Sequence, residues 1–207
     1  MHILRSVLEN NGSGQLVSSA CNVELRQSTF DGKANGGADG ANIVGVVVVD
    51  RCRFTSNSGN GIYVQGDFTM TNSIFDHNYA GAGLVNPTTT PVFTFNTVVD
   101  NSNTGVECLV NTGAAHIAVE NDIISRNPTN SISVGSDVNG CSFPNSIQLA
   151  DISGLHFQQP DTAPYDYHIT AGSIAIDAAT SSSLDHDYDG EPRPKGNRRD
   201  VGADEAF

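Results

Sequence analysis

A short pattern with a period of about 23 residues recurs along much of the chain. A small polar residue is followed two positions later by a large apolar residue, and three positions after that by asparagine, as in Ser73, Phe75 and Asn78. The apolar anchors stand 22, 24, 21, 23 and 26 residues apart; they are Leu8, Phe30, Phe54, Phe75, Val98 and Ile124. Self-similarity at this period is typical of solenoids, so this repeat constrains the fold more than any other feature.

Two further apolar columns precede the anchors. Five positions before each anchor stand Ile3, Leu25, Val49, Met70, Phe93 and Val119. Seven positions before, from the second anchor on, stand Val23, Val47, Phe68, Pro91 and Ile117. The gap of two residues between the columns is the alternation of a β-strand. Each repeat is therefore expected to hold three short strands and three turns, with successive copies stacked about 4.8 Å apart in parallel register.

The asparagine column predicts a ladder of side-chain amides inside one turn of the stack. Its members are Asn11, Asn57, Asn78, Asn101 and Asn127. Asparagine tolerates left-handed backbone and satisfies neighbouring turn groups, so we expect both roles here. A flat sandwich with asparagine-rich hairpins is the alternative, but it gives no reason for a constant three-residue offset from anchor to asparagine.

These columns resemble the right-handed parallel β-helix of the pectate-lyase-like superfamily over about residues 1–135. The resemblance implies an all-β fold, a right-handed parallel β-helix (solenoid) of about six coils plus a C-terminal capping segment. Residues 1–135 are then the coils, and residues 136–207 are the last irregular coil and the cap of the same domain. The resemblance concerns architecture, because many unrelated activities share this fold.

The C-terminal segment resembles the ending of bacterial secreted or surface β-helix proteins of the choice-of-anchor kind. The order of a strand, a small-residue turn, an Asp-rich loop and a final strand is kept over residues 165–169, 172–178, 185–194 and 199–205. The chain departs from that pattern at Ile174, Ala179 and Asp204. The resemblance implies an extracellular or cell-surface location, and we expect the segment to cover the edge of the last coil.

Charge excludes several partners. The formal net charge is −13, from 10 Lys and Arg against 23 Asp and Glu. Nucleic-acid binding needs clustered basic residues, so no nucleic-acid partner is expected. An apolar run of about 20 residues is missing, so no membrane span is expected either. The repeat begins at Ile3 with nothing before it to cover the first coil, which predicts a possible end-to-end homo-oligomer through this edge or a truncated natural chain.

Four cysteines allow three pairings, and the sequence does not choose among them. Cys52 and Cys108 fall at inward positions of the repeat and are interpreted as small buried thiols. Cys21 and Cys141 lie in linking segments and are better disulfide candidates, though not necessarily with each other.

Charged side chains that follow the anchors in successive coils form the candidate site. Stacking is expected to cluster Asp31, Lys33, Arg53, Asp76, His77 and Asp100. Asp76 and Asp100 are candidate catalytic acids or Ca²⁺ ligands, Lys33 or Arg53 is a candidate base, and Asp31 and His77 are candidate substrate-binding residues. The alternative is a solvated turn rich in Asp and Asn.

A second candidate is a cation loop at Asp185, Asp187 and Asp189, followed by Gly190. Alternating aspartates begin an oxygen-ligand calcium loop, so Ca²⁺ is a possible cofactor. Gly196 stands where an EF-hand needs glutamate, which excludes a regular EF-hand. The alternative is a tight turn with Asx hydrogen bonds and a pair between an aspartate and Arg193 or Arg198.

Three functions fit these observations. The first is a secreted or cell-surface module that binds polysaccharide without a recognisable catalytic signature. The second is a polysaccharide lyase or glycoside hydrolase acting on an acidic polysaccharide, which needs a base or a pair of carboxylates. The third is a structural or adhesive stalk.

Overall fold

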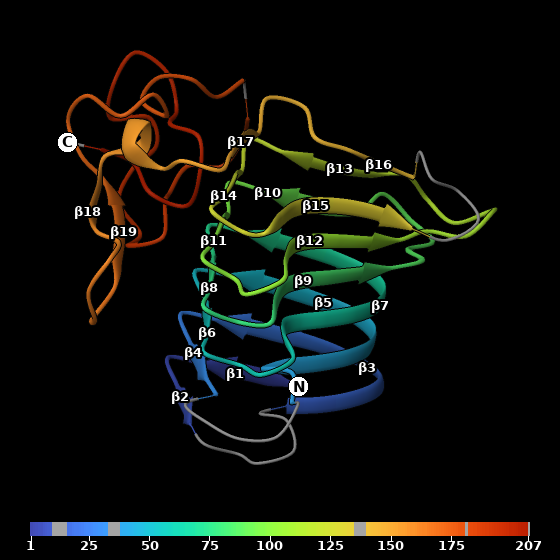
Figure 1. Ribbon diagram of the computed structural model, residues 1–207. Helices are drawn as coiled ribbons and strands as arrows, with labels where there is room; N and C mark the ends of the chain where they lie inside the picture. The colour runs from blue at the N-terminus through green and yellow to red at the C-terminus, as the bar shows by residue number, and fades with distance from the viewer. Residues whose placement is uncertain (10–15, 33–37, 135–139, 181, 207) are drawn as a thin grey trace.

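A computed structural model describes residues 1–9, 16–32, 38–134, 140–180 and 182–206, with side chains undescribed at 16–21 and 133–134. Lys33 and Asn11 therefore lie outside the described residues. The chain forms a parallel β-solenoid, with the C-terminal segment packed against one side of the stack (Figure 1). None of the helices in the described part of the chain has the length and apolar character needed to cross a bilayer.

Two parallel sheets build the solenoid. Sheet A runs in the order β1 (His2–Leu4), β3 (Leu16–Arg26), β5 (Ala41–Asp50), β7 (Asn60–Thr71), β10 (Val92–Thr94), β13 (Ile117–Glu120) and β16 (Cys141–Ser142), and it is extended beside β7 by β9 (Ala80–Val85), β12 (Thr104–Leu109) and β15 (Thr129–Val134). Sheet B comprises β2 (Val7–Glu9), β4 (Thr29–Asp31), β6 (Arg53–Thr55), β8 (Ile74–Asp76), β11 (Thr97–Val99), β14 (Ile123–Ser125) and β17 (Ile147–Leu149).

The C-terminal segment contains a short 3₁₀ helix, η1 (Ser153–Leu155), and an antiparallel hairpin of β18 (Phe157–Gln159) and β19 (Asp166–Ile169). The parallel strands continue to Leu149.

The early coils merge two of the three expected strands into one bent strand. Gly45 in β5 and Gly66 in β7 are paired and have φ angles of 142° and 131°, which an L side chain rarely adopts. A Cβ on Gly66 would lie 2.1 Å from the carbonyl oxygen of Gly45, so the bend requires glycine. The three-strand expectation holds for the later coils, and the seven strands of sheet B lie one in each successive coil of the described residues.

The predicted anchors line the core of the stack. Each anchor pairs with the next along sheet B, as in Phe30 with Phe54 and Phe54 with Phe75. The rings of Phe30 and Phe54 stack 4.7 Å apart, and those of Phe54 and Phe75 stack 5.1 Å apart. All anchors are fully buried except Leu8, which is partly buried at the first coil. The predicted register is confirmed.

The asparagine ladder is confirmed within the described residues. Nδ2 of Asn57 donates to Oδ1 of Asn78 at 2.8 Å, and Asn78 and Asn101 donate in the same way to Asn101 and Asn127 at 3.0 Å. The expected left-handed backbone at these residues is wrong, because the positive φ belongs to the residue before each asparagine, as in His77. That residue turns the chain, which leaves the asparagine free to point inward and bond.

A second ladder runs through the small polar residue two positions before each anchor. The hydroxyl of Ser73 accepts the N–H of Cys52, Oδ1 of Asn96 accepts the N–H of Ser73, and Oδ1 of Asp122 accepts the N–H of Asn96. The side chain of one coil thus caps the backbone of the coil before it. This contact explains why the column contains small polar residues.

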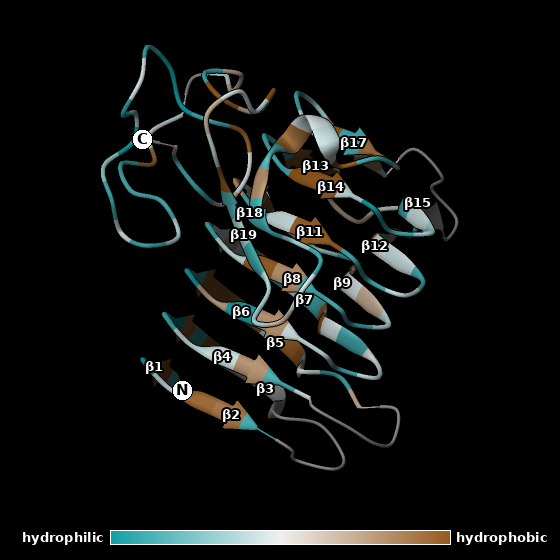
Figure 2. Cartoon of the chain, turned by 60° about the vertical axis from the view of Figure 1, so that its left-hand side comes forward, coloured by the Kyte–Doolittle hydropathy of each residue, from teal (hydrophilic) through white to brown (hydrophobic). Residues whose placement is uncertain are grey.

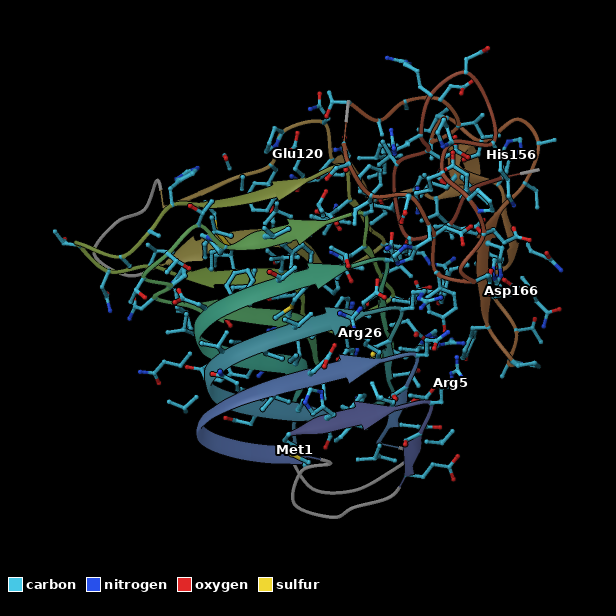
Figure 3. The ribbon with its side chains drawn as sticks, turned by 180° about the vertical axis from the view of Figure 1, so that it is seen from behind. Met1, Arg5, Arg26, Glu120, His156 and Asp166 are labelled. Atoms are coloured by element: carbon cyan, nitrogen blue, oxygen red, sulfur yellow. A yellow bond between two sulfur atoms is a disulfide. The ribbon has the colours of Figure 1, made fainter. Side chains whose placement is uncertain are left out.

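The C-terminal segment packs along the side of the stack and also contacts Ile147 and Leu149 of β17, the last strand of sheet B; cover of the open edge of that coil stays a prediction. Its apolar residues form a cluster with outward side chains of sheet B, in which Ile74, Val99 and Ile123 pack with Leu155 and Tyr167. Figure 3 shows His156 and Asp166 on this segment, beside the coils rather than above them. The physical reason is the apolar outer face of β8, β11 and β14, which must be removed from water.

The structure contains a disulfide between Cys108 and Cys141. The prediction for Cys141 is confirmed, while the interpretation of Cys108 as a buried thiol is wrong, because its sulfur is bonded to that of Cys141, with the two Cα atoms 6.3 Å apart. Cys52 is a buried free thiol, as predicted, and burial raises its pKa to about 12. The side chain of Cys21 is outside the described residues.

Candidate functional site

The outer face of sheet B has an open half and a covered half. Over β8, β11 and β14 the outward side chains are apolar and packed beneath the C-terminal segment. Over β2, β4 and β6 they are polar or exposed: Val7 and Glu9 face solvent, and Thr29 and Arg53 are half-buried. The loop joining β18 and β19 reaches across β8 toward the open half (Figure 2). The boundary between the two halves is where a ligand could contact both parts of the chain.

A groove of about 550 Å³ lies at this boundary. Its floor comes from β4 and β6, and its walls come from the hairpin loop and the Asp-rich loop. The residues that line it are Thr29, Asp31, Arg53, Thr55, Ser56, Ala163, Pro164, Tyr165 and Tyr188. Burial raises the pKa of Tyr188 to about 12, so its hydroxyl keeps its proton at neutral pH. The groove therefore combines two aromatic rings with hydroxyl, carboxylate and guanidinium groups.

Arg53 is held at the inner end of the groove by Asp76. Nε of Arg53 lies 2.8 Å from Oδ1 of Asp76, and Nη2 lies 2.9 Å from Oδ2. Nη1 of Arg53 donates to the carbonyl oxygen of Tyr165 at 3.2 Å, which ties the hairpin to sheet B. Burial opposes the charge on Arg53, but the bonds to Asp76 outweigh it and raise the pKa of Arg53. A raised pKa argues against the predicted role of Arg53 as a base.

Asp76 is fully buried and has no room for a substrate. Besides Arg53, its carboxylate accepts a hydrogen bond from Thr55 at 2.9 Å and contacts Nδ1 of His77 at 3.0 Å. Burial raises the pKa of a carboxyl group, but here the bonds from His77 and Arg53 outweigh burial and lower the pKa of Asp76. Asp76 is thus an ionised anchor for the groove wall.

His77 and Asp100 lie beneath the hairpin. The imidazole of His77 stacks on the ring of Tyr165 with centroids 3.9 Å apart. The hydroxyl of Tyr167 donates to Oδ2 of Asp100 at 2.6 Å, and Arg126 pairs with the same carboxylate. The two tyrosines therefore close over the predicted cluster and separate His77 and Asp100 from the open groove.

A family model described as a right-handed beta helix region matches residues 2–147. The chain belongs to this family. The handedness expected from the sequence is thereby confirmed, since the matched region covers every strand of the solenoid up to β17. No curated protein and no solved structure matches the chain.

The β-helix brings most of the predicted site residues together. Arg53, Asp76, His77 and Asp100 form one bonded network, and Asp31 lines the groove beside it. Lys33 is outside the described residues, so its predicted role stays a prediction. Sequence reasoning missed Arg126, although it occupies the same position after its anchor as His77 and Asp100 do, and that column could have revealed it. It also missed Tyr165, Tyr167 and Tyr188, for which the repeat offers no signal.

The three aspartates of the expected calcium loop point in different directions. Oδ1 of Asp187 accepts the backbone N–H groups of Asp189 and Glu191, which is an Asx-type turn. Asp185 contacts His186, and Asp189 contacts His168. The Asx hydrogen bonds of the tight-turn alternative are present, whereas Arg193 pairs with Glu205 at 3.0 Å instead of with an aspartate; Ca²⁺ at this loop stays a prediction.

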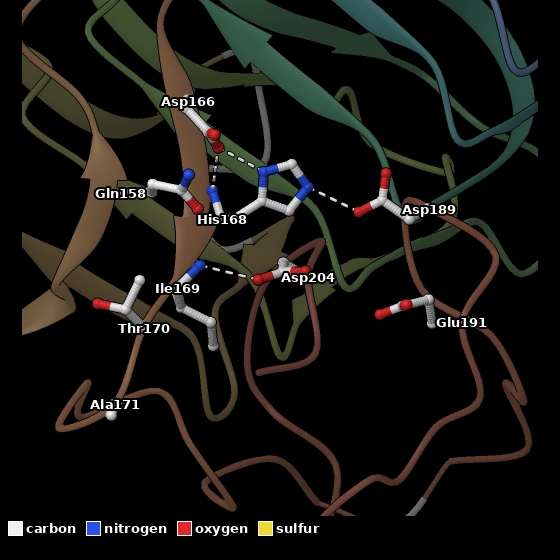
Figure 4. Close-up of a pocket in the computed structure, with 9 residues that line it drawn as sticks. All are labelled: Gln158, Asp166, His168, Ile169, Thr170, Ala171, Asp189, Glu191 and Asp204. Carbon is white, nitrogen blue, oxygen red and sulfur yellow. Dashed lines mark hydrogen bonds and ion pairs between the residues drawn. The ribbon is translucent and has the colours of Figure 1, made fainter. Parts of the chain in front are cut away.

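A different group of side chains on the C-terminal segment has ligand atoms close enough to share a cation. Among the described residues, His168, Asp189 and Asp204 offer one ligand atom each within 4.8 Å of one another (Figure 4). The hydrogen bond to Asp189 outweighs burial and, with Asp166, raises the pKa of His168 to about 10. Only Asp189 was among the residues predicted for a metal.

Proposed function

We propose that this β-helix is a secreted or cell-surface module that binds polysaccharide in the groove between sheet B and the hairpin loop. The observation that carries the proposal is the groove lining, where the rings of Tyr165 and Tyr188 lie beside Thr29, Thr55 and Ser56. Aromatic rings pack on the apolar faces of sugars, and hydroxyl groups exchange hydrogen bonds with sugar hydroxyls.

The state of the predicted catalytic residues supports binding over turnover. Asp76 is buried and ionised against Arg53, and Asp100 is occupied by Tyr167 and Arg126. A lyase base must reach a sugar proton, and a hydrolase needs two carboxyl groups facing the glycosidic oxygen. A carboxylate that already accepts bonds from an arginine and a hydroxyl meets neither need.

The location outside the cytoplasm is supported by the disulfide between Cys108 and Cys141. Structural disulfides persist in oxidising compartments and are rare in the cytosol of mesophiles. The net charge of −13 disfavours long-range attraction of polyanions, so a neutral polysaccharide suits the groove better than a polyuronate.

Affinity electrophoresis against a neutral glucan, a neutral xylan and polygalacturonate tests the proposal. We expect retardation by a neutral polymer and about tenfold weaker binding by Tyr165→Ala, which corresponds to about 1.4 kcal/mol. Tyr63→Ala is the matched control, because Tyr63 lies in β7 of sheet A, over Gly83. If only Tyr63→Ala loses binding, the polysaccharide site lies on sheet A and the proposal is wrong. If no polymer retards the wild-type chain, the adhesive-stalk function is favoured.

Turnover is measured in parallel on polygalacturonate by absorbance at 235 nm, with and without Ca²⁺. We expect no unsaturated product. Product that forms with the wild-type chain and disappears with Asp76→Ala or Lys33→Ala would instead establish the lyase.

A further inference from the structure

A cavity inside the C-terminal segment carries a set of metal-ligating side chains that the groove does not use. The cavity measures about 550 Å³ and lies between β19, the Asp-rich loop and the end of the chain. Figure 4 shows the imidazole of His168 at its centre, with Asp166 on one side and Asp189 on the other. Asp204, Glu191, Gln158 and Thr170 complete the polar lining.

The orientation of His168 is fixed from behind by Asp166. Nδ1 of His168 contacts Oδ1 of Asp166, and the same oxygen accepts the backbone N–H of His168 at 3.0 Å. Nε2 therefore points away from Asp166 and lies 2.6 Å from Oδ2 of Asp189. A carboxylate bonded to one imidazole nitrogen while the other nitrogen faces outward is the arrangement that orients metal-binding histidines in proteins.

Asp204 supplies the third ligand from another part of the chain. Its side chain is buried, and Oδ2 is held in place by the backbone N–H of Ile169 at 2.8 Å. The ligand atoms of His168, Asp189 and Asp204 lie within 4.8 Å of one another. A tetrahedral ion with bonds of about 2.0–2.2 Å holds its ligands roughly 3.4 Å apart, so side-chain shifts of about an ångström close the site.

The charges around the cavity also favour a cation. Three aspartates, at positions 166, 189 and 204, face a single imidazole. The basic side chain of Lys195 pairs with Glu191 at the edge of this lining. A divalent ion between these side chains would offset the charge of the carboxylates.

We propose that His168, Asp189 and Asp204 bind a divalent transition-metal ion of the Zn²⁺ or Mn²⁺ type, with Asp166 as the positioning residue. One imidazole nitrogen with two carboxylate oxygens suits these ions, whereas Ca²⁺ requires six to eight oxygen ligands. The ion would join β19, the Asp-rich loop and the C-terminal end, so it would stabilise the segment that forms the groove wall. The remaining coordination positions face the cavity.

Isothermal titration of the full chain, purified with chelator, tests this site with ZnCl₂, MnCl₂ and CaCl₂ in turn. We expect saturable binding of a single Zn²⁺ or Mn²⁺ and a higher Tm with the metal than with EDTA. Asp166→Asn should weaken binding about 10- to 100-fold, and His168→Gln should weaken it further. His116→Gln is the matched control, because His116 is an exposed histidine just before β13 that is bonded to Ser142 of β16 and does not line this cavity, and it should bind as the wild type does.

Asp189→Asn separates loss of metal binding from loss of folding, because Asp189 lies on an exposed loop. This variant should lose metal binding while its circular dichroism spectrum stays the same as that of the wild type. The proposal is overturned if the folded wild-type chain binds neither ion saturably, if Ca²⁺ alone binds, or if folded Asp189→Asn binds as tightly as the wild type. Polysaccharide retardation by the groove is measured separately, so failure of the metal site leaves that result intact.

Discussion

The solenoid and the C-terminal segment both bury polar groups, but they satisfy them in different ways. In the asparagine ladder of the solenoid core the buried groups are neutral and repeated: Asn78 accepts from the coil before it and donates to the coil after it. Inside the C-terminal segment they are charged and occur once. Arg193 is 4% exposed and lies over the ring of Phe95, and its guanidinium bonds Glu205 and the carbonyl oxygens of Asp200 and Gly202.

This difference between neutral and charged buried groups predicts which region loses more stability when one partner is removed. A neutral amide that loses its partner leaves one unsatisfied group, which costs about 1–3 kcal/mol. A buried charge that loses its partner costs more, about 3–5 kcal/mol, because an uncompensated ion remains in a medium of low dielectric constant. The solenoid should therefore tolerate single changes better than the segment that forms the groove wall.

The largest effect is expected for Arg193→Ala. Glu205, whose side chain is fully buried beside it, would lose its cationic partner, and three backbone carbonyl groups would lose their donor. We expect the free energy of unfolding of the C-terminal segment to fall by about 3–5 kcal/mol. Urea unfolding followed by near-ultraviolet circular dichroism, which reports on Tyr165 and Tyr167, measures the loss.

The double variant Arg193→Met with Glu205→Leu separates charge from packing. Removing both partners leaves no buried ion, so most of the lost stability should return. If Arg193→Ala lowers the free energy of unfolding by less than about 1 kcal/mol, the Arg193–Glu205 pair contributes little to stability. The expected contrast between the two regions would then be wrong.

A smaller effect is expected for Asn78→Ala in the middle of the ladder. The change removes four hydrogen bonds, to Asn57, Phe54 and Asn101, and we expect a loss of about 2–3 kcal/mol by urea unfolding. Asn60→Ala is the control, because Asn60 is only partly buried and its side-chain amide donates to Oδ1 of Asp39 at 2.9 Å instead of joining the ladder. Asn60→Ala should lower the free energy of unfolding by about 1 kcal/mol or less. Equal losses in the two variants would show that the ladder does not stabilise the solenoid more than an ordinary surface hydrogen bond does.

The register of the solenoid could be predicted from the sequence because each contact is repeated in every coil. The same register is enough to predict that Arg53, Asp76, His77 and Asp100 lie together. The cover over them could not be predicted, because Tyr165 and Tyr167 belong to a segment that has no repeat and so no fixed register with sheet B. One signal in the sequence does point to a cover: the outward residues of sheet B change from Glu9 and its neighbours to the apolar Ile74, Val99 and Ile123.

A charged residue in the second polar ladder gives the smallest and most selective prediction. Asp122 is the charged member of the second polar ladder and is fully buried. Its Oδ1 accepts the N–H of Asn96, whereas Oδ2 has no hydrogen-bond partner among the described residues. Burial raises the pKa of Asp122 well above its usual value, so the folded state favours the protonated carboxyl group.

Asp122→Asn should therefore stabilise the chain at pH 7, by about 1–2 kcal/mol. Asn96 occupies the equivalent position in the preceding coil, and its Nδ2 donates to the carbonyl oxygen of Met70. Phe93 is the equivalent of Met70 one coil later, so its carbonyl oxygen can accept a hydrogen bond from the new amide at position 122. Because the folded pKa is raised, the wild type is most stable below the unfolded pKa of about 3.9 and loses stability as the pH rises through the folded value. The advantage of the variant should thus be small near pH 4 and grow toward neutrality.

Thermal unfolding of both chains from pH 4 to pH 8 measures this difference. Asp67→Asn is the control with the opposite sign, because the backbone N–H groups of Thr89 and Thr88 outweigh desolvation and lower the pKa of Asp67. That change should lower stability above the unfolded pKa of the aspartate. An Asp122 variant that is less stable than the wild type at pH 7, or whose advantage does not vary with pH, would mean that the buried carboxylate is compensated. The polar ladders of the solenoid core would then satisfy a buried charge as the C-terminal segment does, and the contrast between ladder and segment would disappear.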